Sequence, residues 1–189
     1  MGKQFDLIII GAGPGGYVAA KKAAKLGMSV VIIDKGDVGG TCINRGCIPT
    51  KALVHAAMLY REMTECEKFG LSAEKVGFDL QKIYEYKDLS AARMREELEK
   101  EFKELGVVSV RGTATIQSDK KVRVVTPNKE EEYYYGKHIL IATGARARTI
   151  DIPGLDLPGV MTSEELLTSN ESQYRRLLIP VSYTHLTLP

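Results

Sequence analysis

Three glycines near the amino terminus constrain the fold more than any other feature of this chain. Gly11, Gly13 and Gly16 follow an apolar run at residues 5–10 and precede an alanine-rich segment at residues 17–26. The run predicts a buried parallel strand, and the segment predicts a helix. A glycine turn between strand and helix lets a pyrophosphate approach the backbone at the helix amino terminus. The pattern therefore predicts a dinucleotide-binding β-α-β unit.

An acidic residue after the second predicted strand completes this unit. Residues 29–33 form another apolar run, and Asp34 follows it, 23 positions after Gly11 (34 − 11). A carboxylate at this point can accept hydrogen bonds from ribose hydroxyls and repels a 2′-phosphate. Glycine turns also occur for purely structural reasons, and these residues do not distinguish FAD from NAD.

Two closely spaced cysteines follow this unit, in the segment CINRGC at residues 42–47. Flanking glycines would let the backbone approach a ring system, and a helix start near Cys42 would lower a thiol pKa. A pair so placed in a chain with three cysteines indicates redox chemistry. Two inert buried cysteines are one alternative. Zinc is another, but Cys66 is the only further thiol, and no Cys-x-x-Cys or histidine pair accompanies it.

The remaining pattern predicts an α/β chain. The cysteine segment predicts a helix over about 42–69, with a kink or a late start at Pro49, and a second, amphipathic helix is expected over 83–105. Five short strands with a period of two follow over 107–142, as an antiparallel meander that returns to the main sheet. Ser163 is the expected cap of a short helix after a glycine- and proline-rich linker.

Composition excludes several classes of partner. The 26 basic and 24 acidic side chains give a net charge of +2, which is too small to favour nucleic acid or an anionic membrane. No apolar run approaches the roughly 18 residues of a membrane span, and the first residues lack a secretory signal. Three cysteines are too few for a secreted disulfide scaffold, so we expect a cytoplasmic protein.

Residues 39–51, GGTCINRGCIPTK, closely resemble the active-site segment of the class I pyridine nucleotide–disulfide oxidoreductases. The resemblance covers about residues 5–179. Within that family, the ending IPTK at 48–51 and the opening GGYVAA at 15–20 are most similar to the dihydrolipoyl dehydrogenases. The resemblance implies a Rossmann-like FAD-binding domain, here incomplete, in which helices and an antiparallel β-meander accompany a parallel sheet.

Individual roles also follow from the resemblance. It implies a redox disulfide between Cys42, which would exchange with substrate thiols, and Cys47, which would lie next to the flavin. Lys51 matches a lysine near the flavin ring, where a cation could stabilise the anionic reduced flavin. Ten further positions are assigned to FAD binding: Gly11, Gly13, Gly16, Asp34, Lys35, Gly40, Thr41, Gly112, Thr143 and Gly144.

The resemblance also predicts the domain organisation. Residues 1–145 would form the first segment of the FAD-binding domain, and residues 146–179 a linker with the start of an NAD-binding domain. A second glycine fingerprint should follow a strand near 177–179, but residues 180–189 do not contain it. We expect these last residues to be a non-native tail. The NAD site and the family's catalytic His–Glu pair are expected outside this sequence.

The implied activity is oxidation of dihydrolipoamide by NAD through the disulfide and FAD. A homodimer is implied, with a 2-oxo acid dehydrogenase or glycine cleavage complex as a further partner. Two alternatives stay open. One is another disulfide reductase, similar to glutathione or mercuric reductase, and the other is a non-catalytic flavin-binding module. We expect no turnover by the chain on its own.

Overall fold

The computed structural model describes residues 2–147, 151–170, 174 and 176–179. Its elements, in chain order, are β1 (Lys3–Ile10), α1 (Pro14–Lys25), β2 (Val30–Asp34), α2 (Gly40–Arg45), α3 (Cys47–Thr64), η1 (Cys66–Phe69), α4 (Leu80–Glu104), β3 (Val108–Arg111), β4 (Thr113–Ile116), η2 (Ser118–Lys120), β5 (Lys121–Val125), β6 (Glu131–Ile141) and α5 (Ser163–Thr168).

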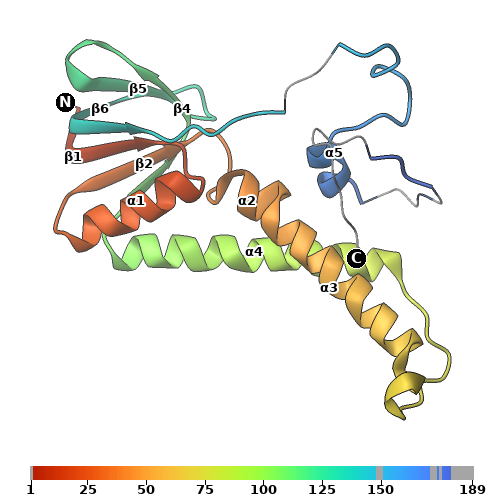
Figure 1. Cartoon of the computed structure of the whole chain (residues 1–189). Coiled ribbons are helices and arrows are strands. Elements are labelled where there is room, and N and C mark those ends of the chain that lie inside the picture. Colours follow the sequence, from red (N-terminus) through yellow and green to blue (C-terminus); the bar gives the residue numbers. More distant parts are fainter. Residues whose placement is uncertain (1, 148–150, 171–173, 175, 180–189) are drawn as a thin grey trace.

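The strands form one sheet in the order β3-β2-β1-β6-β5-β4. Strands β3, β2, β1 and β6 are parallel, whereas β5 pairs antiparallel with both β6 and β4. Helices α1 and α4 lie on one side of the parallel strands, and strands β4 and β5 lie on the other side (Figure 1). The expected fold class, a Rossmann-like α/β unit with an added antiparallel meander, is confirmed.

Neighbouring residues of β1 point to opposite faces, as the period of a strand requires. Ile9 packs with the helices, in a core cluster that includes Ile32 of β2 and Phe102 of α4. Ile8 packs with the meander, in a second cluster that includes Val124 of β5. All four strand residues are at most 1% exposed. The central strands are apolar throughout because both of their faces are buried.

One strand was expected in the wrong part of the sheet. Residues 107–111 read as the start of the antiparallel meander, but β3 pairs in parallel with β2 and forms the opposite edge. Gly112 alone separates β3 from β4. Alternation of side chains identifies a strand but carries no information about its partner, which depends on contacts distant in the sequence. The meander therefore contains only β4, β5 and β6.

Two expected strands, at 131–135 and 138–142, form the single strand β6. Gly136 does not interrupt it. A Cβ atom at this glycine would lie 2.8 Å from the side chain of Ile8 on β1. The glycine therefore allows a close approach between β6 and β1, and β6 joins the parallel strands to the meander.

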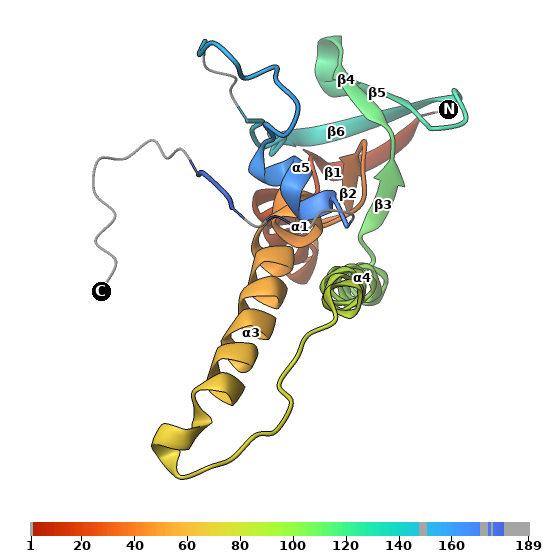
Figure 2. The same cartoon turned by 90° about the vertical axis from the view of Figure 1, so that its right-hand side faces the viewer.

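The helix expected over 42–69 is divided. Helix α2 ends at Arg45, Gly46 separates it from α3, and α3 ends at Thr64 before the short η1. Pro49 does not kink the helix, because it occupies the first turn of α3, where a backbone N–H has no partner within the helix. Helix α3 then extends away from the sheet (Figure 2).

Helices α4 and α5 also begin at residues that differ from those predicted from the sequence. Helix α4 begins at Leu80 rather than 83, because the Asp79 carboxylate accepts a hydrogen bond from the backbone N–H of Lys82 (3.2 Å). The cap of α5 is Thr162 rather than Ser163, in a reciprocal capping box with Glu165.

A buried lysine ties the segment around α5 to α4. The Lys87 side chain is 2% exposed, and its ammonium donates to the Leu167 carbonyl (2.8 Å) and the Asn170 side chain (2.6 Å). Its neighbour Asp88 accepts from the Asn170 amide (2.6 Å). Burial of an ammonium is costly unless its donors are satisfied, and here they are.

Two expectations concern the carboxyl-terminal part. The strand expected near 177–179 does not form: the described residues 176–179 are irregular, and Leu178 is 90% exposed. A strand needs a neighbour to accept its backbone hydrogen bonds, and these residues have none among those described. The tail expected at 180–189 lies outside the described residues. In the described part of the chain, no helix is long and apolar enough to span a bilayer.

Candidate functional site

The glycine fingerprint (Gly11, Gly13 and Gly16) spans the turn from β1 into the first residues of α1. A Cβ on Gly16 would lie 1.8 Å from the Gly11 carbonyl oxygen, so this glycine lets the helix pack on the strand end. Gly13 differs, because it has an ordinary φ of −74° and a Cβ there would meet only the Gly40 Cα, at 3.8 Å. Packing within the chain explains Gly16. At Gly13 the space for a Cβ is nearly free, so packing within the described chain does not require a glycine there.

The cysteine segment begins directly against this turn. The Gly39 N–H donates to the Ala12 carbonyl (2.8 Å), and Gly40 follows with a left-handed φ of +58°. A Cβ on Gly40 would lie 2.6 Å from the Gly13 Cα. Two backbones thus meet without side chains between them, and helix α2 starts at the predicted cofactor turn.

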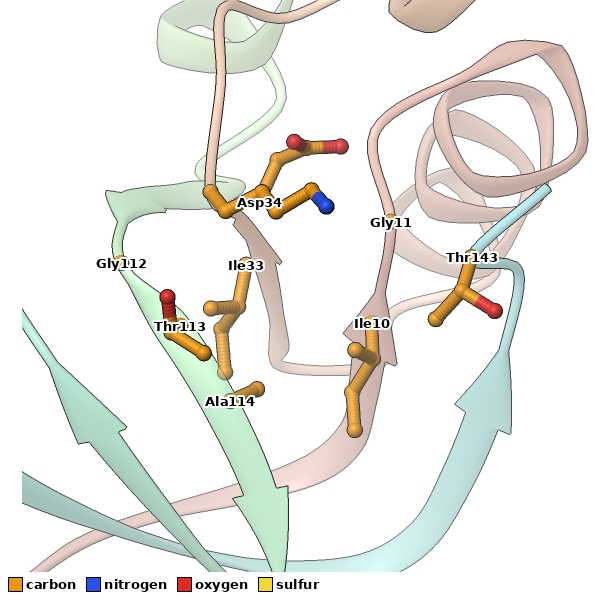
Figure 3. Close-up of a pocket in the computed structure, with 9 residues that line it drawn as sticks. Ile10, Gly11, Ile33, Asp34, Gly112, Thr113, Ala114 and Thr143 are labelled. Carbon is orange, nitrogen blue, oxygen red and sulfur yellow. The ribbon is translucent and has the colours of Figure 1, made fainter. Parts of the chain in front are cut away.

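A pocket of about 170 Å³ opens beside the fingerprint, at the carboxyl ends of β1 and β2 (Figure 3). Asp34 lies at its upper end in this view, with Gly112 and Thr113 on one side and Gly11 and Thr143 on the other. The lining residues are Ile10, Gly11, Ile33, Asp34, Lys35, Gly112, Thr113, Ala114 and Thr143. Five predicted positions thus line one pocket at the sheet edge where ligands of such folds bind.

Backbone donors orient the Asp34 carboxylate. Its Oδ2 accepts from the Ala12 N–H (2.6 Å) and its Oδ1 from the Gly36 N–H (2.8 Å). The Asp34 carbonyl accepts from the Gly112 N–H (2.8 Å), which fixes the β3–β4 junction at the pocket. Each carboxylate oxygen can accept a further hydrogen bond, so contact with ribose hydroxyls stays a prediction.

The two predicted redox cysteines lie on consecutive helices. Cys42 is the third residue of α2 and is partly buried, whereas Cys47 is the first residue of α3 and is exposed. Gly46 lies between the helices, where a Cβ would be 2.9 Å from the Thr41 carbonyl oxygen. Gly46 therefore lets α3 begin close to α2. Both thiols are free, and they form a hydrogen bond.

The local environment raises the pKa of the Cys42 thiol. The hydrogen bond with the Cys47 thiol is the largest cause and burial comes next; a hydrogen bond from the Cys47 backbone and, more weakly, the Lys51 ammonium oppose them. The expectation of a lowered pKa is therefore wrong for Cys42 in the dithiol state, because a neighbouring thiol disfavours its ionisation more than the nearby lysine favours it. Lys51 lies one helical turn after Cys47, on the same face of α3.

Comparison with known proteins agrees with this geometry. The model of the pyridine nucleotide–disulphide oxidoreductase family matches residues 5–179. This chain belongs to that family.

Curated proteins that are similar to this chain are named dihydrolipoyl dehydrogenase. The protein of Zymomonas mobilis is 40% identical over 150 residues, which cover 79% of this chain and 32% of the relative. That of Staphylococcus aureus is 39% identical over 170 residues (86% and 36%), and the mitochondrial protein of Pisum sativum is 36% identical over 185 residues (97% and 37%). The chain thus spans about a third of the length of these relatives.

The sequence predicted two parts of a site, the glycine turn and the cysteine segment, and the structure brings them into contact. Gly144 is exposed and lies outside the pocket lining. Four pocket residues were missed: Ile10, Ile33, Thr113 and Ala114. The first two are the last or nearly the last residues of parallel strands, and their position at the carboxyl edge was the available signal.

Proposed function

We propose that this chain is the FAD-binding, disulfide-bearing part of an enzyme that oxidises dihydrolipoamide and reduces NAD. The observation that carries the proposal is the backbone contact between Gly40 and Gly13. Through it, the helix that bears Cys42 starts at the turn predicted to bind the cofactor pyrophosphate. The names of the curated relatives support the choice of substrate.

The described residues fit FAD. The absence of a side chain at Gly13 would let a pyrophosphate approach the backbone, and α1 presents free N–H groups at its amino terminus. The pocket beside Asp34 and Gly112 suits the adenosine end, and Thr143 borders its far wall. Bound FAD would accept the two electrons of the reduced cysteine pair, so that the disulfide forms again.

The cysteines carry the exchange step in this proposal. A thiolate of the dithiol substrate attacks Cys42 Sγ of the Cys42–Cys47 disulfide, forms a mixed disulfide and releases Cys47 as a thiolate. The second substrate thiolate then attacks the substrate sulfur of the mixed disulfide and releases Cys42. The substrate leaves as a cyclic disulfide, and both cysteines are reduced. Each attack requires loss of a thiol proton to a base.

Lys51 has an electrostatic role in the same step. Its ammonium lowers the pKa of Cys42, against the combined effect of Cys47 and burial. A cation on the face of α3 that bears Cys47 therefore favours the thiolate forms that exchange requires.

The whole enzyme would extend beyond this chain. An NAD site, a catalytic His–Glu pair, a homodimer and a 2-oxo acid dehydrogenase or glycine cleavage complex belong to the proposal for the full-length protein. A cytoplasmic location does too, supported by the low cysteine count. Other disulfide substrates, as for glutathione or mercuric reductases, are the second candidate for the same cysteine pair.

The exchange step can be tested without the cofactor. The chain is oxidised, incubated anaerobically with dihydrolipoamide, and its free thiols are alkylated and located by mass spectrometry. We expect reduction of a Cys42–Cys47 disulfide in the wild type, and no intramolecular disulfide for dihydrolipoamide to reduce in Cys47→Ser. Cys66→Ser is the matched control and should behave as the wild type. Failure to form the Cys42–Cys47 disulfide would refute the proposal.

A further inference from the structure

The side chain of Asn44, between the two cysteines, makes hydrogen bonds that the proposed exchange step does not explain. Asn44 follows Cys42 by two residues on α2. Its amide nitrogen lies within hydrogen-bond distance of the carbonyls of Val38 (3.1 Å) and Gly40 (2.9 Å), and 3.4 Å from that of Asp37. These carbonyls belong to the stretch that leads from β2 to the fingerprint contact. The Asn44 amide therefore ties α2 to the loop beside the cofactor turn.

The other end of the same amide is bound from α4. Arg95 Nη1 donates to Asn44 Oδ1 at 2.9 Å, and both side chains are half-buried. Helix α4 is fixed in the main core by Leu98 and Phe102, and Ile43 of α2 packs in the same cluster. The hydrogen bond from Arg95 therefore links the turn that carries Cys42 to a helix that cannot move independently of the sheet.

We propose that Asn44 and Arg95 are positioning residues for the Cys42–Cys47 pair. They hold the short helix α2 in place, so that the Cys42 thiol stays within reach of Cys47 when the disulfide opens and closes. The proposal rests on the proposed function, because it assumes that these two thiols form a disulfide.

The physical reason is the short length of α2. The helix has six residues, too few for stability without tertiary contacts. Gly46, which joins α2 to α3, has no side chain to restrict its backbone. Without the amide contacts, α2 would sample more orientations relative to α3, and the effective concentration of one thiol at the other would fall.

Two arginines serve as matched controls. Arg93 lies two residues before Arg95 on α4, on a different face, and is exposed. Arg45 follows Asn44 directly and pairs with Glu164 (2.7 Å), but both side chains are at least 40% exposed. An exposed ion pair contributes little to local order, so loss of either control arginine should leave the thiol pair unaffected.

The test measures the effective concentration of the thiol pair in the 189-residue chain, with Cys66→Ser in every variant. The chain is equilibrated with glutathione mixtures, alkylated and analysed by mass spectrometry. One glutathione disulfide oxidises the two cysteines to one intramolecular disulfide and releases two glutathione thiols. We expect Arg95→Met and Asn44→Asp each to lower the effective concentration about tenfold, the size expected for one hydrogen bond to a charged group. Arg93→Met and Arg45→Gln should match the wild type.

The outcomes separate the two proposals. No disulfide in the wild type would contradict the proposed function itself. A wild-type disulfide with unchanged values in Arg95→Met and Asn44→Asp would overturn only the positioning role. Arg95→Lys keeps the charge but loses the planar group, and it should give an intermediate value. If circular dichroism shows that both Arg95 variants unfold, the residue serves folding rather than positioning, and the proposal is wrong.

Discussion

Two glycines of the fingerprint should respond in opposite ways to the same substitution. In Gly16→Ala the new methyl group would lie 1.8 Å from the Gly11 carbonyl oxygen. Backbone atoms on both sides would have to separate by more than about 1 Å to reach ordinary contact, and such overpacking costs about 1–3 kcal/mol. The rigid partner places the cost at the upper end, offset by about 1 kcal/mol of helix propensity. We expect a net loss of about 2 kcal/mol in the free energy of unfolding.

Gly13→Ala should leave the fold intact. The backbone is already in a region open to alanine, and the methyl group would make an ordinary 3.8 Å contact with the Gly40 Cα. Alanine is a weaker N-cap than glycine, which destabilises the fold, but it also makes the unfolded chain less flexible, which stabilises the fold. These effects are similar in size, so the free energy of unfolding should change by less than about 1 kcal/mol. The methyl group would instead occupy space at the turn that we propose for the pyrophosphate. We expect weaker FAD binding by tenfold or more, on the order of 1.4 kcal/mol.

The assay compares urea unfolding, followed by circular dichroism, with FAD titration, followed by flavin fluorescence. The expected pattern is a stable Gly13→Ala with weak binding and a destabilised Gly16→Ala. A Gly13→Ala variant that binds FAD as tightly as the wild type would refute the assignment of this turn to the pyrophosphate. Equal destabilisation of both variants would refute the packing argument.

Three further predictions concern other parts of the chain. Lys87→Met should lower the free energy of unfolding by about 2–3 kcal/mol in urea denaturation, because two carbonyl acceptors near α5 lose a buried charged donor. Unchanged stability would show that these hydrogen bonds do not hold the segment around α5 to α4. The Lys137 ammonium and neighbouring donors hold the pKa of Asp6 well below its ordinary value, so its stabilising effect is present at pH 7 and is lost as the pH falls below that ordinary value. Asp6→Asn should therefore reduce stability at pH 7 but not in strong acid, and an equal loss at both would argue against the ion pair. In Cys47→Ala the pKa of Cys42 should fall, since its largest raising cause is removed, and alkylation of Cys42 at pH 8 should be faster than in the reduced wild type.

The sequence predicted the positions of the pocket residues near the glycine turn better than the arrangement of the sheet. The fingerprint glycines and Asp34 follow from local geometry, because a strand, a tight turn and a helix fix their positions within one unit. The partner of β3 could not be predicted, since its pairing with β2 depends on α4 carrying the chain back to that edge. The pocket role of Gly112 came from family resemblance, not from its neighbours in the sequence.

The cysteine segment shows the same limit on a smaller scale. Residue type and spacing predict a redox role for this segment, but they did not predict the break at Gly46, because Pro49 was the stronger local signal. The raised pKa of Cys42 also depends on the tertiary proximity of Cys47. Arg95 lies about fifty residues from Asn44 in the chain (95 − 44), so no sequence pattern pointed to their contact.

The central claim is that the cysteine pair and the FAD site form one path for electrons from a dithiol. The most direct test adds dihydrolipoamide anaerobically to the chain in excess FAD and follows the absorbance of the bound flavin. We predict loss of the oxidised-flavin absorbance in the wild type and none in Cys42→Ser or Cys47→Ser. Bleaching at the wild-type rate in both serine variants, or a wild-type chain that binds no FAD, would contradict the account.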